Sequence, residues 1–158
     1  YGDHRDLHLS LRRQRQMCIR DRYMGNDIMH CGKAGSGQLT KILNNMILFE
    51  TVVALSEAAN IAENYGMDVE SLYENITKCS GDSFALRNHG LKSIAKNNFP
   101  TPAFSSEYAL KDLTYALELG EKLNVKMPGA LSAKELLKTS IQNGDKDLYF
   151  PVMKKYFN

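Results

Sequence analysis

The most constraining feature of the sequence is a long apolar pattern with helical spacing. It runs from about Gln38 to Asn64 and contains no proline or glycine, while Gly66 lies just beyond its end. Its middle is apolar nearly all round the helix: Ile42, Leu43, Met46, Ile47, Leu48, Phe49, Val52, Val53 and Leu55. Such a helix is packed on several sides. At roughly 27 residues it spans about 40 Å, longer than a small core needs. The pattern therefore predicts a central helix that joins two domains or two subunits.

The remaining signals predict shorter helices and turns. The predicted helices are Val69–Lys78, a helix from Ser105 or Ser106 to about Asn124, a helix from Pro128 to Gly144, and Asp147–Phe157. Asp68 is a suitable N-cap, and Pro128 suits a first helical turn. Residues 80–83 form a predicted turn, in which Ser83 caps a further helical turn, and residues 97–102 an extended linker. Because no alternating strand pattern occurs, the predicted class is all-α.

Composition excludes several classes of protein. The 158 residues are 43% hydrophobic and 24% charged, as is ordinary for a globular chain. No apolar run reaches the roughly 18 residues of a membrane helix, so we expect no membrane partner. The three cysteines, Cys18, Cys31 and Cys79, contain no C-x-x-C pair, and the four histidines have no ligand pattern. We therefore expect no metal site and a cytoplasmic, reducing location.

Residues 1–22 differ in composition from the rest of the chain. They hold six of the seven arginines, and the following 136 residues hold only Arg87 against thirteen lysines. We interpret residues 1–22 as a non-native or disordered leader, and residues 23–158 as one helical domain. The alternative is a basic arm that binds nucleic acid. Without these residues the net charge changes from +2 to −1 (14 basic against 15 acidic residues), so we expect no nucleic-acid partner.

Lys41 and Asn45 are the candidate chemical groups of the long helix. Lys41 is expected in the first turn or so, where a cation opposes the helix dipole; this suits a lysine that must exchange a proton. Asn45 lies four residues further, on the same face. Most helix lysines are simply solvated, however. The preceding Gly32, Gly35 and Gly37 match neither a dinucleotide fingerprint nor a P-loop. They indicate either a tight turn, letting the helix start close to another backbone, or a ligand contact.

The motifs together resemble a known family. The run from Gly32 to Asn45 is similar to the G-x-x-G-x-G-x-x-x-K-x-x-N-N signature of the β-hydroxyacid dehydrogenases. Phe104 followed by Leu110–Leu113 resembles the family's F-x6-K-D-L segment. Residues 80–86 resemble its small-residue turn, and Gly144-Asp145-x-Asp147 also fits. The resemblance covers roughly residues 23–158 and is closest to 3-hydroxyisobutyrate dehydrogenase.

This resemblance implies a fold and an activity. The fold is the helical C-terminal domain of the 6-phosphogluconate dehydrogenase-like type. The activity is hydride transfer between NAD or NADP and a small β-hydroxyacid such as 3-hydroxyisobutyrate. Lys41 becomes the catalytic acid/base, and Asn45 and Lys111 bind substrate. Phe104, Lys111 and Asp112 bind the cofactor, with Asp112 holding Lys111. Taken alone, Lys111 and Asp112 are more typical of an exposed charged pair on an amphipathic helix.

The resemblance also implies partners outside this sequence. The family's N-terminal Rossmann domain, which carries most of the cofactor site, has no counterpart among these motifs. We therefore expect a Rossmann domain of the same protein as a partner, no useful turnover by this chain alone, and a homo-oligomer. The alternative is a stand-alone helical oligomerisation module without catalytic activity.

Overall fold

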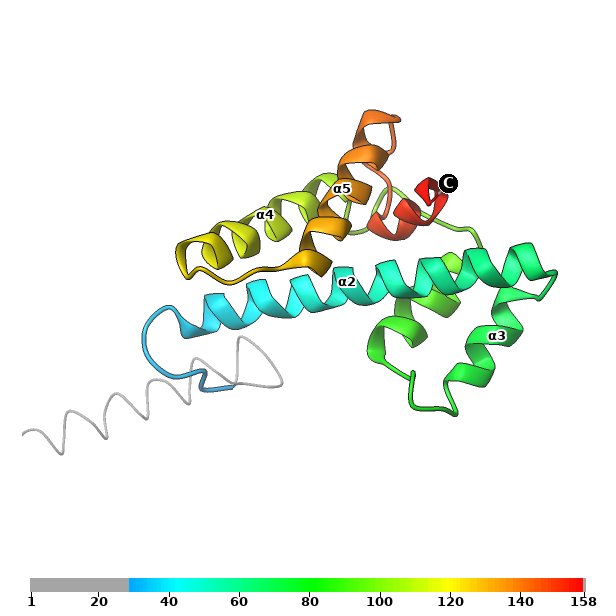
Figure 1. Ribbon diagram of the computed structural model, residues 1–158, viewed down its shortest axis with the longest axis horizontal. Helices are drawn as coiled ribbons and strands as arrows, with labels where there is room; N and C mark the ends of the chain where they lie inside the picture. Colours follow the sequence, from blue (N-terminus) through cyan, green and yellow to red (C-terminus); the bar gives the residue numbers. More distant parts are fainter. Residues whose placement is uncertain (1–28, 158) are drawn as a thin grey trace, which may run out of the picture. The chain divides into compact units, whose positions relative to one another are not determined.

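The computed structural model describes residues 29–157, and within that range it is helical. It divides into two compact units, one ending at Gly37 and one beginning at Gln38. The elements are α2 (Ser36–Tyr65), α3 (Val69–Ile76), the π-helix η1 (Leu86–Ile94), α4 (Ser106–Lys122), α5 (Pro128–Gln142) and the 3-10 helix η2 (Phe150–Tyr156) (Figure 1). Between residues 29 and 157, the only β pairing is a single bridge of Ser105 with Tyr149. The all-α prediction is confirmed.

The long helix α2 matches the predicted one to within two residues at each end. Its seven buried residues all lie in the half that begins at Phe49: Phe49, Val52, Val53, Leu55, Ser56, Ala59 and Ala62. The first half is more open, and the Ile47 side chain is 61% exposed. Packing on several sides is therefore confirmed for the C-terminal half of α2, while the N-terminal half is only partly buried by the described residues.

The expectation that no apolar segment reaches the length of a membrane helix is wrong, because the length and hydropathy of α2 meet the criteria for a membrane-spanning helix. Core helices of soluble proteins meet the same criteria, so this is weak evidence. Seven of its residues are buried against other elements of this chain. The absence of a membrane partner stays a prediction from the sequence.

The second unit, from Gln38 onward, is built around α2. Figure 1 shows α4, α5 and η2 along one side of α2, and α3 with η1 along the other. The Tyr73 hydroxyl of α3 donates to the Leu55 carbonyl of α2 at 2.6 Å, and both residues are buried. On the other side, the Phe150 ring of η2 packs edge-on against Phe49 with ring centroids 5.1 Å apart. Burial of these apolar faces is the main stabilising contribution.

Local sequence signals place the helix ends correctly. The Asp68 carboxylate accepts from the Ser71 backbone N–H at 2.8 Å, and this bond lowers the pKa of Asp68. Ser105 caps α4 by accepting from the Tyr108 N–H. α5 begins at Pro128, whose missing N–H costs nothing in a first turn. Gly144, at φ +93°, lies just beyond the end of α5.

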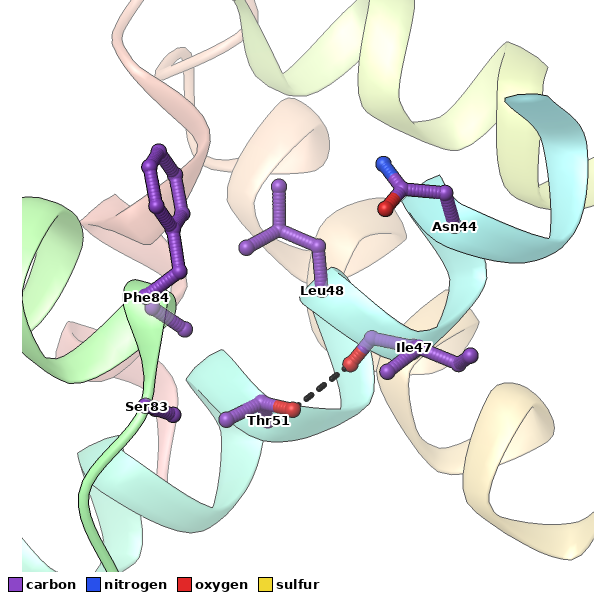
Figure 2. A pocket seen from close by; sticks show the side chains of 7 residues that line it. Asn44, Ile47, Leu48, Thr51, Ser83 and Phe84 are labelled. Atoms are coloured by element: carbon purple, nitrogen blue, oxygen red, sulfur yellow. Dashed lines mark hydrogen bonds between the residues drawn. The ribbon is translucent and has the colours of Figure 1, made fainter. Parts of the chain in front are cut away.

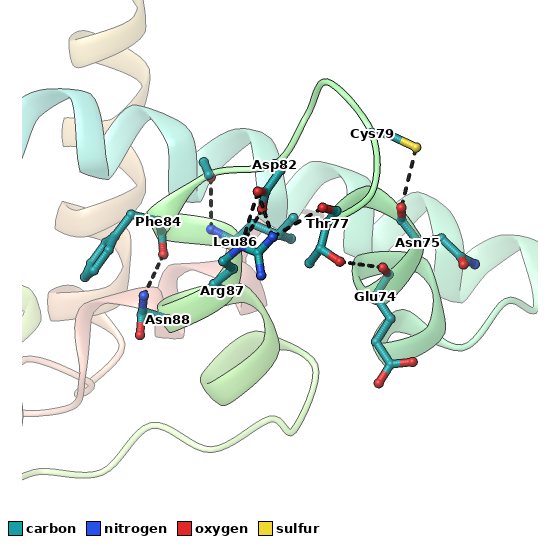
Figure 3. Close-up of polar contacts among 10 residues, drawn as sticks. Glu74, Asn75, Thr77, Cys79, Asp82, Phe84, Leu86, Arg87 and Asn88 are labelled. Carbon is teal, nitrogen blue, oxygen red and sulfur yellow. Dashed lines mark hydrogen bonds and ion pairs between the residues drawn. The ribbon is translucent and has the colours of Figure 1, made fainter.

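The segment after α3 is more regular than predicted. The Ser83 hydroxyl accepts from the Leu86 N–H at 3.0 Å, as expected for a cap, but a nine-residue π-helix follows rather than a single turn. Figure 3 shows how its start is held: Arg87 binds the Asp82 carboxylate through two nitrogens, and also the Thr77 carbonyl. Nothing in the local residue pattern distinguishes i→i+5 from i→i+4 bonding, so this form was missed.

The first unit shows what two of its glycines do. Gly32 and Gly35 have positive φ angles of +106° and +89°, which only glycine adopts easily. The predicted tight turn before α2 is thus confirmed. The predicted close approach to another backbone is not seen: a Cβ at Gly35 or Gly37 meets no atom within 4 Å in the part of the chain described.

Candidate active site

Two donors from α2 converge on one carboxylate of α4. Lys41 Nζ and Asn45 Nδ2 each donate to Asp112 Oδ2 at 2.7 Å. The Asp112 side chain is only 12% exposed, while the Lys41 side chain is 52% exposed. The lysine is therefore anchored at its inner side and open to solvent at its outer side. An ammonium has three N–H donors and a primary amide has two, so both groups keep donors for a further partner.

The helical spacing explains why Asp112 lies inside. The buried face of α4 consists of Ala109, Asp112, Leu113, Ala116 and Gly120 along with Ser106. An aspartate in an otherwise small and apolar stripe must find partners, because burying an unpaired carboxylate is costly. On α2, Lys41 and Asn45 are four residues apart and so project from the same face.

The structure corrects the expected partner of Asp112. Its carboxylate binds Lys41 and Asn45 on α2, not the neighbouring Lys111. Lys111 lies one position away from the buried face, is exposed, and forms no hydrogen bond or ion pair with residues 29–157. The alternative expectation, an exposed charged pair, is also wrong for Asp112 because Asp112 is buried.

Lys41 lies deeper in its helix than expected. Because α2 begins at Ser36, Lys41 is in the second turn rather than the first. The helix dipole acts mainly within the first turn, so its influence on Lys41 is weaker than the sequence suggested. The dominant electrostatic partner of Lys41 is Asp112.

Phe104 provides a partly exposed aromatic surface at the start of α4. Phe104 is 39% exposed. Its ring stacks on the Phe49 ring with centroids 6.2 Å apart and planes 15° from parallel. Phe150 meets the same ring edge-on. A flat ring packed from behind by Phe49 and Phe150 could hold a nicotinamide ring. Residues 29–157 contain no strand followed by a glycine-rich turn of the kind that binds a pyrophosphate.

A small cavity of about 120 Å³ adjoins Asn45. Aromatic rings form most of its wall, which consists of Asn45, Leu48, Phe49, His89, Phe104, Tyr149 and Phe150. His89 Nδ1 is hydrogen-bonded to the Tyr149 hydroxyl. Burial, with a smaller effect of Lys92, lowers the pKa of His89, and burial raises the pKa of Tyr149. Both shifts favour the neutral forms of the two side chains.

His89 and Tyr149 were missed as site residues by the sequence analysis. They are 60 residues apart, and neither belongs to the motifs discussed above. For Asp112, by contrast, the position on an apolar helix face could have indicated that its side chain is buried. No comparable signal exists for His89, because η1 has no α-helical periodicity.

A second hollow of about 460 Å³ lies on the other side of Leu48. Figure 2 shows Leu48 pointing between Phe84 and Asn44, with Thr51 bonded to the Ile47 carbonyl. The Ser83 hydroxyl is similarly engaged by the Leu86 N–H. Since its polar side chains bind neighbouring groups and its rim is apolar, this hollow offers little for a polar substrate. No group of three His, Cys, Asp or Glu side chains able to hold a metal occurs in the described residues.

Comparisons with known proteins agree with this architecture. A family model described as "NAD-binding of NADP-dependent 3-hydroxyisobutyrate dehydrogenase" matches residues 35–156. The chain therefore belongs to a family of NAD(P)-dependent hydroxyacid dehydrogenases. More specifically, the chain belongs to the 3-hydroxyisobutyrate dehydrogenase family. The expected cofactor class, NAD or NADP, agrees with the family's description.

This chain matches only part of the length of its individual relatives. A probable 3-hydroxyisobutyrate dehydrogenase of Mycobacterium tuberculosis is 35% identical over 100 residues, 60% of this chain and 34% of that protein. The 2-(hydroxymethyl)glutarate dehydrogenase of Eubacterium barkeri is 34% identical over 113 residues, 72% of this chain and 37% of that protein. The chain thus spans less than half the length of these relatives.

A solved structure shows the same fold. The 3-hydroxyisobutyrate dehydrogenase of Mycobacterium tuberculosis with L-serine superposes with a TM-score of 0.76 at 30% identity, over 85% of this chain and 48% of that one. A Salmonella typhimurium 3-hydroxyisobutyrate dehydrogenase gives a TM-score of 0.72 at 20% identity, over 78% of this chain and 42% of that one, and supports the fold alone.

Proposed function

We propose that this chain is the helical half of an NAD(P)-dependent β-hydroxyacid dehydrogenase in which Lys41 is the catalytic acid/base. The observation that carries the proposal is the convergence of Lys41 and Asn45 on the buried Asp112. In a stand-alone oligomerisation module, nothing explains why a buried carboxylate should hold a lysine whose side chain is half exposed to solvent.

The proposed reaction converts HOCH₂–CHR–COO⁻ and the oxidised cofactor into OHC–CHR–COO⁻, the reduced cofactor and a proton. The cofactor supplies the hydride acceptor. In its neutral amine form Lys41 takes up the hydroxyl proton during oxidation, and in its ammonium form it returns that proton during reduction. Asp112 fixes the position of Nζ during both steps, which matters because proton transfer requires hydrogen-bonding distance to the reacting oxygen.

Three further residues orient the reactants in this proposal. Asn45 donates its second amide N–H to the substrate, one helical turn from Lys41. Phe104 packs against the nicotinamide. Lys111, exposed and without a partner between residues 29 and 157, presents its charge to the substrate carboxylate or to the cofactor. Asp112 contributes to this site through Lys41 and Asn45 rather than by holding Lys111.

The two domains of the proposed enzyme have different roles. Residues 23–158 form the substrate and dimerisation domain, and a Rossmann domain of the same protein supplies the rest of the cofactor site. Residues 1–22, proposed as a leader, lie outside the described residues. A homo-oligomer follows from the family resemblance, and the partly exposed N-terminal half of α2 is consistent with a covered surface.

The test is steady-state oxidation of 3-hydroxyisobutyrate by the full-length protein, with Lys41→Ala and the charge-preserving Lys41→Arg. Loss of general acid/base catalysis typically costs about 10²–10⁴ in rate, so we expect kcat to fall by that factor in both variants. Lys138→Ala is the matched control, because Lys138 is an exposed helix lysine paired with Glu135. An unchanged kcat and pH profile in Lys41→Ala would refute the role of Lys41.

A further inference from the structure

The cavity lined by Asn45 adjoins the proposed substrate site. The cavity lies on the C-terminal side of Lys41 along α2, because Asn45, Leu48 and Phe49 supply its α2 wall. Lys41 and Asn45 are about 6 Å apart along the helix axis. A small hydroxyacid whose hydroxyl meets Lys41 and whose carbon skeleton passes Asn45 therefore reaches this cavity with its C2 substituent.

The lining of this cavity favours an uncharged group. Its seven residues include no lysine or arginine. The one lining side chain that can take up a proton to become a cation is His89. Burial lowers the pKa of His89, and its Nδ1 is already hydrogen-bonded to the Tyr149 hydroxyl. A carboxylate placed here would lose part of its hydration without gaining a counter-charge, which is unfavourable. The volume of about 120 Å³, roughly four water molecules, suits a methyl or ethyl group.

The His89 ring forms part of the cavity wall although one of its nitrogens is left without a hydrogen bond to the described residues. Its Nε2 atom is buried and has no hydrogen-bond partner among the described residues. Leaving such a nitrogen unpaired is unfavourable, so packing alone would favour an apolar residue. His89 also lies in a π-helix, a form that occurs frequently at functional sites. What His89 gains is the bond that fixes the Tyr149 hydroxyl.

We propose that His89 and Tyr149 determine substrate specificity, selecting β-hydroxyacids whose C2 substituent is small and uncharged. Tyr149 forms the wall that limits the substituent, and His89 is a positioning residue that acts through Tyr149. This inference rests on the proposed dehydrogenase function. It separates substrates that differ only at C2, such as 3-hydroxyisobutyrate, with a methyl group, and 2-(hydroxymethyl)glutarate, with a carboxyethyl group.

The first experiment compares kcat/KM of the wild-type full-length protein on these two substrates and on 2-ethyl-3-hydroxypropionate. We expect the carboxyethyl substrate to be at least about tenfold poorer than the methyl substrate, since a misfit group is rejected by factors of this order or more. Equal or better use of the carboxyethyl substrate overturns the inference while leaving the dehydrogenase function intact. Turnover of none of the three refutes the proposed function instead.

The second experiment changes the wall. Tyr149→Ala opens the cavity, so the ratio of kcat/KM for 2-(hydroxymethyl)hexanoate, which carries a butyl group at C2, over the methyl substrate should rise by at least about tenfold, because even one methylene group changes this ratio by about that factor. Tyr65→Ala is the control, because Tyr65 is 87% exposed at the end of α2. A ratio is insensitive to partial unfolding, which lowers both activities alike. An unchanged ratio in folded Tyr149→Ala overturns the inference.

The third experiment tests the positioning role of His89. The His89→Asn amide can still bond Tyr149 from the position of Nδ1, whereas His89→Leu cannot. We expect His89→Leu to raise KM for the methyl substrate severalfold with little change in kcat, and His89→Asn to restore KM. Equal kinetics in both variants would show that His89 only fills space.

Discussion

The ion pair of Lys41 and Asp112 should contribute measurably to the free energy of unfolding. It joins α2 to α4 through atoms 2.7 Å apart. We propose a double-mutant cycle with Lys41→Met and Asp112→Asn, in which each change keeps the approximate size of the side chain. The cycle isolates the interaction of the two side chains from their separate effects.

The magnitude follows from the burial of the two partners. Hydrogen bonds to charged groups contribute about 1.5–3 kcal/mol. Lys41 is half exposed, so solvent screening reduces this towards the value of about 1 kcal/mol found for well-placed surface pairs. We therefore expect a coupling energy of roughly 1–2 kcal/mol. Lys41→Met alone should be the more damaging single change, because it leaves Asp112 buried with Asn45 as its remaining partner.

The assay is urea unfolding of the four proteins followed by circular dichroism. Unfolding free energies are compared at low salt and again at about 1 M salt, where exposed charges are screened. The coupling should shrink but not vanish, because Asp112 is only 12% exposed. A coupling below about 0.3 kcal/mol at low salt, within the usual additivity of independent sites, would refute the argument that Asp112 anchors Lys41.

Three further predictions concern other parts of the second unit. Tyr73→Phe removes the buried hydroxyl that binds the Leu55 carbonyl and should cost about 1 kcal/mol of unfolding free energy in urea titrations; no loss would show that this bond contributes nothing. Asp68→Ala removes the cap of α3 and should cost about 1 kcal/mol, while Asp68→Asn should cost little; equal losses would contradict capping by the side-chain oxygen. Burial, with Lys92, lowers the folded-state pKa of His89 below 6.5, so the unfolded chain takes up the proton first and stability should fall as pH drops below about 6.5. The urea midpoint should therefore decrease less between about pH 7.5 and about pH 5.5 in His89→Asn than in wild type, and an identical decrease would contradict a neutral His89 bonded to Tyr149.

Most of the fold could be predicted from local signals. The absence of proline and glycine between Gln38 and Asn64, with continuous apolar residues, predicted α2 closely because helix formation depends on residues close in sequence. The caps at Asp68 and Ser105 and the start at Pro128 were placed correctly for the same reason. The π-helical form of η1 was not predicted, because nothing in its local residue pattern distinguishes i→i+5 from i→i+4 hydrogen bonding.

The site divides in the same way. The sequence by itself singled out Lys41 and Asn45 on one helix face, and its resemblance to the β-hydroxyacid dehydrogenases pointed to the K-D pair on α4. Only the tertiary structure decided that Asp112 turns inward to Lys41 and Asn45 while Lys111 stays outside, and that His89 and Tyr149 close a cavity beside them. The physical reason is that helical spacing determines which residues share a face, whereas the packing of one helix against another determines which charges meet.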